Sequence, residues 1–196
     1  MSSVILFGRV LSTKDPDKLG RVQVEVVGLG KRLTLPWARV LQPTASGEHG
    51  HLFLPEEGDE VVVLRGLEDR PEGLLVLGAL YNAARPPATP DADGKNNLKE
   101  IRTRAGHALS FNDKEGHESI SLTSGDGKLS FTLDQKGGTL TLTGDKKVVV
   151  SSKAAIQVSG DKIEVTGKSE LTLKSNSKVV LQGGEISLSG SKVKIA

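Results

Sequence analysis

Apolar residues in the last third of the chain come in pairs, with one position between the two members. From position 140 onward, successive pairs are 7 or 8 residues apart, and a Gly or Ser stands two positions after each of the first seven pairs. Residues i and i+2 of a strand point to the same face, so each repeat predicts a short strand with two inward side chains and then a tight bend. The sixteen residues predicted to face inward are Leu140, Leu142, Val148, Val150, Ile156, Val158, Ile163, Val165, Leu171, Leu173, Val179, Leu181, Ile186, Leu188, Val193 and Ile195.

A single chain cannot bury the apolar stripe that this repeat creates. Burying one aliphatic side chain contributes roughly 1.5–3 kcal/mol, while ordering the backbone of one residue costs roughly 1–2 kcal/mol. Two half-covered side chains cannot offset eight ordered residues, and one chain would also leave its strand edges unpaired. We therefore expect several copies to wrap together with their stripes on a common axis. The alternative is a disordered Ser/Thr/Lys/Gly tail, which offers no reason for the register.

The first 80 residues follow a different pattern, in which apolar and polar positions alternate over short segments. Gly, Pro and Asp lie between the segments, as is typical of turns. Pro36 interrupts the third segment and predicts an edge or a bulge there. Five short strands at this spacing predict a small closed barrel. The predicted strands are residues 7–11, 21–27, 33–41, 60–65 and 74–80.

Composition divides the chain in the same way. All eight Pro lie at or before Pro90, all Arg at or before Arg104, and no aromatic residue follows Phe131. Residues 1–119 have a net charge of −2, whereas residues 120–196 have +4 and contain Lys as their only basic residue. Residues 85–97 are rich in Pro, Asp and Asn, which favours a linker over an ordinary surface loop. We predict a barrel at 1–85, a linker at 86–99, and a region of about 8-residue repeats at 100–196.

Candidate chemistry is sparse. The chain has no Cys, which excludes disulfides, Cys-ligated zinc and thiol catalysis, and no Gly-x-Ser-x-Gly motif occurs. His49 and His51 are the closest His pair, but a metal site would need a third ligand such as Glu48, so we favour loop contacts or solvated rings. Residues 28–31 suggest a phosphate loop and fail the full pattern. We predict no catalytic residue, no cofactor and no metal, and therefore not an enzyme.

Two further classes are disfavoured. The longest apolar run near the N-terminus, residues 4–7, is too short for a signal peptide or a membrane span. Barrels that bind single-stranded nucleic acid use a basic groove and stacking aromatics. Residues 1–119 are net acidic, and Trp37 and Phe53 are expected in the core. We therefore predict no nucleic-acid binding.

Several segments, in this order, resemble the VgrG and phage baseplate assembly protein V family. The resemblance covers about residues 8–125, and the repeat behind it is similar to the needle of that family. It implies an all-β fold, with an N-terminal oligosaccharide/oligonucleotide-binding (OB) type barrel and a C-terminal trimeric intertwined β-helix, or β-prism. The segments are residues 20–24 (GRVQV), 36–40 (PWARV), 50–63 (GHLFLPEEGDEVVV), 69–71 (DRP), 77–82 (LGALYN), 101–113 (IRTRAGHALSFND) and 120–122 (ISL).

The resemblance also implies a function. Members are central spikes of contractile injection machines, homotrimers that dock on a hub at the tube end and puncture the target envelope mechanically. VgrG proteins carry a hub domain before the barrel, which begins here near residue 4, so we expect a separate hub protein. Some spikes of this kind end in an iron-binding His-x-His apex, whereas this chain ends in Val193, Lys194, Ile195 and Ala196. We expect that end to bind a separate PAAR-type tip.

The setting remains open among a phage tail, a tailocin-like particle and a secretion system. In each, we expect assembly in the producer cytoplasm, followed by incorporation into the tail or contractile particle, because the chain shows neither a signal peptide nor a transmembrane segment. One alternative function is a trimeric carrier or adhesin shaft that displays a tip or an effector. Another is an OB-fold binder of single-stranded nucleic acid.

Overall fold

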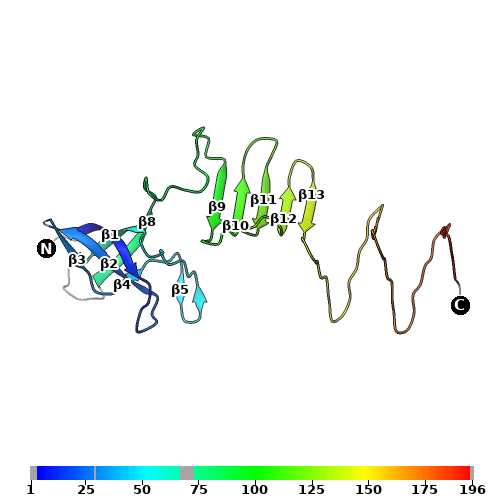
Figure 1. The fold of residues 1–196 in the computed structure, drawn as a ribbon, viewed down its shortest axis with the longest axis horizontal. Helices are drawn as coiled ribbons and strands as arrows, with labels where there is room; N and C mark the ends of the chain where they lie inside the picture. The colour runs from blue at the N-terminus through cyan, green and yellow to red at the C-terminus, as the bar shows by residue number, and fades with distance from the viewer. Residues whose placement is uncertain (1–3, 29, 67–72, 195–196) are drawn as a thin grey trace. The chain divides into compact units, whose positions relative to one another are not determined.

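The computed structural model describes residues 4–28, 30–66 and 73–194. The chain divides into two compact units, residues 1–143 and 144–196. The first unit contains a β-barrel and an antiparallel sheet of five strands (Figure 1). Every bounded element in the described ranges is a β-strand, and the one helical residue there is Gly73 in a 3₁₀ conformation, so the predicted all-β class is confirmed.

Five strands form the barrel and close on themselves. They follow the order β1-β7-β8-β4-β2, and β2 pairs back with β1. Only the β4–β8 pairing among them is parallel. A further strand, β3 (Lys31–Thr34), extends β2 as a hairpin. Closure leaves the ring without a free edge, and the predicted small barrel is confirmed. The barrel strands are β1 (Val4–Ser12), β2 (Arg21–Gly28), β4 (Ala38–Val40), β7 (Glu60–Arg65) and β8 (Leu74–Leu80).

The third predicted strand was wrong in one respect, because residues 33–41 belong to two strands. β3 ends at Thr34 and β4 begins at Ala38, with Pro36 between them. Proline has no N–H to donate to a ladder and fixes its φ angle, so the hairpin with β2 ends there. The chain then crosses to pair with β8. The predicted turn at residues 69–71 lies outside the described residues.

The core of the barrel is built mainly from valine. The inward positions of each strand alternate with outward ones, as the sequence pattern predicts. Trp37 is half-buried, but Phe53 is 59% exposed, so its predicted place in the core is wrong. Phe53 lies in an irregular segment that has no strand to turn it inward. The buried core residues are Val10, Val22, Val24, Val26, Ala38, Val61, Val63, Leu74 and Val76.

Gly8 lies in β1 at a point where the strand pairs with both neighbours, Val26 of β2 and Val61 of β7. A Cβ atom at this position would lie 2.4 Å from Cγ1 of Val24 and 2.8 Å from the carbonyl oxygen of Glu25. Real Cβ atoms do not approach other atoms so closely. The ring of strands therefore closes here only because residue 8 has no side chain.

The loop between β1 and β2 is organised by the carboxylate of Asp15, whose side chain is only 4% exposed. Its Oδ2 atom accepts hydrogen bonds from the backbone N–H groups of Leu19 (2.9 Å) and Arg21 (3.2 Å), and Oδ1 accepts one from the Arg21 guanidinium (2.6 Å). The Arg21 side chain, followed by the backbone donors, holds the pKa of Asp15 well below its usual range, although partial burial opposes this.

The chain that leaves the barrel is held against an acidic turn before β7. Arg85 donates from Nη1 to Oδ1 of Asp59 (2.5 Å), and Nδ2 of Asn82 donates to Oε2 of Glu60 (2.8 Å). Asn82 and Arg85 also form a short bridge with each other. The described structure has no strand from residue 86 to residue 97. The boundaries of the predicted linker stay a prediction.

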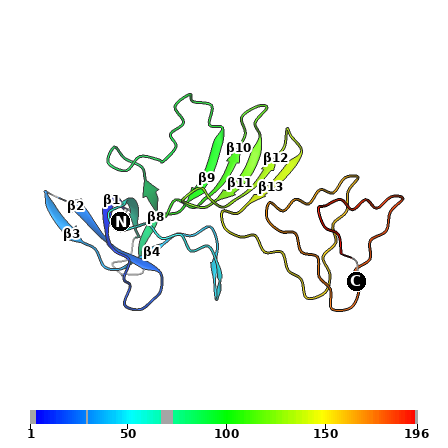
Figure 2. The same ribbon diagram turned by 45° about the vertical axis from the view of Figure 1, so that its right-hand side comes forward.

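Five consecutive strands then form an antiparallel meander, in which each strand pairs with the next along the chain (Figure 2). Four hairpin turns connect them, and each turn contains one glycine at positive φ, a conformation that costs other residues energy. These glycines are Gly106, Gly116, Gly127 and Gly138. The strands are β9 (Leu98–Arg102), β10 (Ala108–Asn112), β11 (Ser119–Thr123), β12 (Ser130–Asp134) and β13 (Thr139–Thr143).

The second unit has a repeated course but no ladder of its own. Residues 144–194, its described part, form no strand, and all of them except the half-buried Gly144 are exposed. The chain bends once after each of the first seven predicted apolar pairs, at residues 145–146, 153–154, 161, 168–169, 176–177, 184 and 190–191. The bends therefore recur with the period of the sequence repeat. The predicted β-helix itself stays a prediction.

We expect Gly8→Ala to destabilise the barrel by about 1–3 kcal/mol, because the added methyl group overpacks the contact with β2. Gly78→Ala is the matched control, since a Cβ there would meet nothing within 4 Å. It should change the free energy of unfolding by less than about 0.5 kcal/mol. Urea unfolding followed by the fluorescence of Trp37, the single Trp of the chain, measures both. Equal effects would contradict the close approach at Gly8.

We expect Asp15→Asn to lower the melting temperature of the barrel at neutral pH. A carboxyl group whose pKa is lower in the folded than in the unfolded chain stabilises the fold above its unfolded pKa, about 3.9 for Asp. That contribution is lost as the pH falls through the lower folded pKa. The difference in melting temperature between the parent and the variant should therefore become smaller below about pH 4. Asp17→Asn, whose side chain is 65% exposed, should have a smaller effect. A gap that stays constant with pH would exclude the charge as its cause.

Candidate functional site

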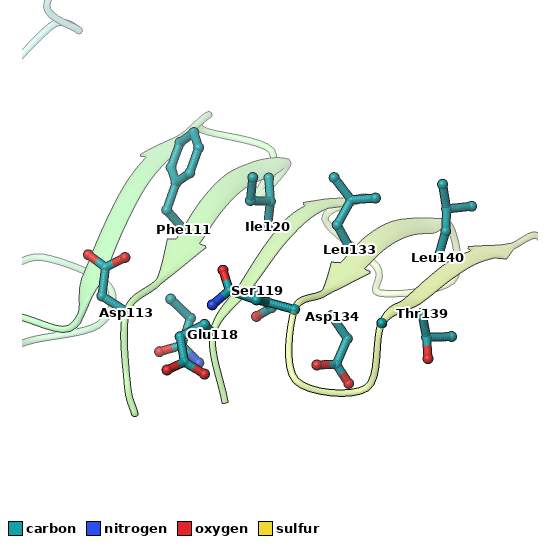
Figure 3. Close-up of a pocket in the computed structure, with 12 residues that line it drawn as sticks. Phe111, Asp113, Glu118, Ser119, Ile120, Leu133, Asp134, Thr139 and Leu140 are labelled. Carbon is teal, nitrogen blue, oxygen red and sulfur yellow. The ribbon is translucent and has the colours of Figure 1, made fainter. Parts of the chain in front are cut away.

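The meander has two chemically different faces. Partners in the antiparallel register share a face, so Phe111, Ile120, Leu133 and Leu140 form one cross-strand row. Figure 3 shows these four side chains on the same side of the sheet. A second row lies on that face, two residues away along each strand. It consists of Leu109, Leu122, Phe131 and Leu142. We call these eight residues the apolar face.

The opposite side, the hydroxyl face, carries Ser and Thr on β11 to β13. One of its rows is Ser110, Ser121, Thr132 and Thr141. At its β9 end, Arg102 donates two hydrogen bonds of 2.7 Å to the carboxylate of Glu100, and Ser110 donates another of 3.0 Å. These donors lower the pKa of Glu100, Arg102 most of all. The polar groups are thus satisfied on a face that suits contact with water.

The exposure of the two faces is the reverse of what a soluble monomer requires. Leu109 is half-buried, but the other seven residues of the apolar face are between 37% and 61% exposed. Ser121 and Thr132, on the hydroxyl face, are half-buried. A contiguous apolar patch of this kind marks an interaction site. A single sheet with one uncovered apolar face also lacks the second layer that stabilises sheets.

A shallow groove of about 460 Å³ runs along the first apolar row. Its other edge is polar and includes Asp113, Glu118 and Asp134, which Figure 3 shows below the apolar side chains. Backbone N–H groups, followed by Lys136 and His117, lower the pKa of Glu118. The groove is therefore apolar along one side and anionic along the other. Such a groove is suited to binding a ligand or a partner that is apolar on one side and cationic on the other.

The residues predicted to face inward are all uncovered where they are described. Leu140 and Leu142 lie in β13 and join the apolar face, opposite Leu133 and Phe131 of β12. The thirteen from Val148 to Val193 lie between the bends and are 49% to 71% exposed. Val193 and Lys194 of the predicted tip-binding end are exposed, whereas Ile195 and Ala196 lie outside the described residues.

Sequence reasoning missed the earlier part of the apolar face. Leu109/Phe111, Ile120/Leu122 and Phe131/Leu133 are i, i+2 pairs of the same kind as the later ones. The first members of successive pairs, up to Leu140 of the next pair, are separated by 11, 11 and 9 residues. A search for pairs with a variable spacing would have found them. The longer spacing reflects the hairpin turns between these strands.

The histidine pair lies in a small hairpin of β5 (Ala45–Ser46) and β6 (His49–Gly50). Nδ1 of His49 is 2.9 Å from the carbonyl oxygen of Gly47, and Nδ1 of His51 is 3.0 Å from Oγ1 of Thr44. Each ring thus makes a local contact. Within the described residues, no three His, Cys, Asp or Glu side chains gather as metal ligands would.

Comparison with known proteins identifies the barrel. Residues 6–81 match the family of type VI secretion system and phage-baseplate injector OB domains. The barrel is an injector OB domain of this family. The match spans all five barrel strands apart from the first two residues of β1, and the closed ring is the architecture that the family name describes. The resemblance to the VgrG and baseplate assembly protein V family is confirmed.

Two relatives from Vibrio cholerae extend beyond the injector OB domain. The chain is 33% identical over 117 residues to the type VI secretion system spike protein VgrG3, a match that covers 54% of this chain and 11% of VgrG3. It is 28% identical over 160 residues to the actin cross-linking toxin VgrG1, covering 74% of this chain and 14% of the toxin. The chain thus spans about one ninth to one seventh of the length of these relatives.

No helix in the described ranges is long and apolar enough to cross a bilayer.

We expect Leu122→Asp to break the self-association of the chain, because it places a charge in the middle of the apolar face. Ser121→Asp is the matched control, since it adds the same group to the neighbouring residue of β11 on the hydroxyl face. In a monomer, Leu122 would be 56% exposed and its replacement well tolerated. Light scattering should show a smaller particle for Leu122→Asp alone. If neither variant changed the size of the particle, the apolar face would not be part of the interface between copies.

Proposed function

We propose that this protein is the central spike of a contractile injection machine and that it acts as a homotrimer. The observation that carries the proposal is that apolar side chains recur along the chain and are exposed, from Phe111 in β10 to Val193 near the end of the described residues. These side chains lie directly behind an injector OB domain. VgrG3, which is 33% identical over 117 residues, is a type VI secretion system spike protein.

Three copies together can bury the apolar side chains and pair the strand edges that one copy leaves exposed. Each repeat contributes two apolar side chains, and three such stripes around one axis enclose a continuous core. Their unpaired strand edges can then pair between copies, which supplies the missing ladders of residues 144–194. The number three comes from the resemblance to the family, and the need for more than one copy comes from burial. The apolar face of the meander begins this shared core, and the sixteen inward residues from Leu140 to Ile195 continue it.

The barrel end docks on a hub at the end of the tube, and the shaft enters the target envelope. The proposed hub is a separate protein, and the proposed partner of Val193, Lys194, Ile195 and Ala196 is a PAAR-type tip. Contact with the envelope is transient and mechanical. Assembly in the producer cytoplasm precedes incorporation into the tail or particle. We propose no role for nucleic acid.

The proposed action is not enzymatic. Residues 6–81 match injector OB domains, and a mechanical role needs no chemistry at the groove beside the apolar face. The toxin VgrG1 cross-links actin, but the match covers only 14% of it, so that activity is not carried over. A trimeric carrier or adhesin shaft that displays a tip or an effector would share the same core. Its barrel would have no hub to bind.

The test compares two neighbouring substitutions in one repeat. Ile163→Asp would bring three carboxylates close to one axis, and burying unpaired like charges should cost at least about 3 kcal/mol per trimer. Glu164 faces the other way and is exposed, with an ion pair of 2.9 Å to Lys162. Glu164→Lys should therefore change stability by no more than about 0.5 kcal/mol. Thermal melts with light scattering measure both melting temperature and trimer content.

Three results would contradict the proposal in different ways. A folded monomer for the parent would remove the trimer. Equal melting of the two variants would mean that inward and outward positions are not distinguished. If Glu164→Lys were the damaging change, the register of the repeat would be displaced by one residue, and every inward residue from Leu140 to Ile195 would need reassignment.

A further inference from the structure

The two units of the chain carry opposite net charge. Residues 144–196 contain nine Lys and five Asp or Glu, a net charge of +4, whereas residues 1–143 contain 17 basic and 19 acidic residues, a net charge of −2. The boundary is the one that the structure draws at residue 144. The positive charge is therefore concentrated in the exposed repeat.

The lysines of the repeat occupy a regular set of positions. Lys147, Lys162, Lys178 and Lys192 each stand directly before an apolar pair, at intervals of 15, 16 and 14 residues, or two repeats. Positions one residue from an inward side chain point to the opposite face of a strand. All four are exposed in the structure. Once the apolar pairs are buried, these four side chains lie on the outer surface. Glu170 and Glu185 hold the same position in two of the intervening repeats, and Glu164 pairs with Lys162 at 2.9 Å, so the outer surface is positive on balance and not uniformly.

The chemistry of this surface favours a lipid partner over a nucleic acid. The repeat contains no aromatic residue on which bases could stack and no Arg to grip a phosphate with two parallel hydrogen bonds. Lysine acts as a hydrated point charge on a flexible stem and is attracted to any dense layer of phosphate groups. A lysine-rich surface of this kind recognises the charge density of its partner and not the base sequence or the shape of that partner.

We propose that the outer surface of residues 144–196 binds anionic phospholipid headgroups of a membrane. The proposal rests on the proposed spike function in one respect, because three copies multiply the charge of the repeat to +12. Binding is electrostatic, so it depends on the fraction of anionic lipid and weakens as salt shortens the screening length. It brings the shaft to the surface that the spike must cross.

The experiment uses the full chain and two kinds of vesicle, phosphatidylcholine alone and phosphatidylcholine mixed with phosphatidylglycerol. The test variant replaces Lys147, Lys162, Lys178 and Lys192 with Gln. The control variant replaces four exposed lysines of the first unit, Lys14, Lys31, Lys95 and Lys114, with Gln. Both variants have the same net charge, so only the position of the lost charge differs.

We expect the parent and the control variant to sediment with the phosphatidylglycerol vesicles and not with phosphatidylcholine alone. The test variant should bind more weakly by about tenfold or more, since each lysine near an anionic surface contributes to binding. High salt should release the parent. Equal binding by the two variants would overturn the proposal, because net charge alone would then explain it.

Two competitors identify the ligand, and light scattering separates this proposal from the previous one. Inorganic phosphate should displace the protein no better than chloride of equal ionic strength, and greater displacement would mean a site for free phosphate. If single-stranded DNA bound as tightly as the vesicles, the ligand of this surface would be polyanions in general and not lipid. A monomeric parent contradicts the trimer whatever the vesicles show. Trimeric variants that bind vesicles equally contradict only the lipid surface.

Discussion

The dominant physical constraint on this protein is an apolar stripe that one chain cannot bury. On β11 and β12 of the meander, the Ile, Leu and Phe side chains are more exposed than the Ser and Thr side chains behind them. In the repeat, every described inward residue is at least 49% exposed. Hydrophobic burial is the main favourable term in folding, and here most of it is available only between copies. In the proposed homotrimer, folding of the second unit would therefore be coupled to assembly.

The barrel avoids this constraint because its strands close into a ring. Its core consists of small β-branched side chains, and Gly8 lets β1 approach two neighbours at once. Asp15 satisfies the backbone of the β1–β2 loop, so this part of the ring depends on no partner. A self-contained domain that precedes a dependent one suits a spike. In the proposed spike, the barrel would fold first and then hold the start of the shaft.

The change from meander to repeat follows from the number of residues between strands. Segments of 4 to 6 residues separate β10 to β13, which is enough for a hairpin turn, so each strand pairs with its neighbour in the same chain. After Thr143 the apolar pairs follow every 7 or 8 residues. A five-residue strand in each repeat would leave only two or three residues for a turn. The chain bends there but does not fold back into a hairpin. Pairing within the chain stops, and pairing between chains becomes the remaining option.

The amino-acid sequence by itself determined the strands of the barrel, the all-β class and the period of the repeat. These features follow from local alternation, which each segment carries independently of its partners. Only the tertiary structure decided which strands pair. It divided residues 33–41 at Pro36, closed β2 onto β1, and left Phe53 outside the core. It also brought Leu109 to Leu133 into rows with Leu140 and Leu142, although their spacing along the chain differs from the repeat. Register across a hairpin depends on turn length and long-range hydrogen bonds, and no single segment contains that information.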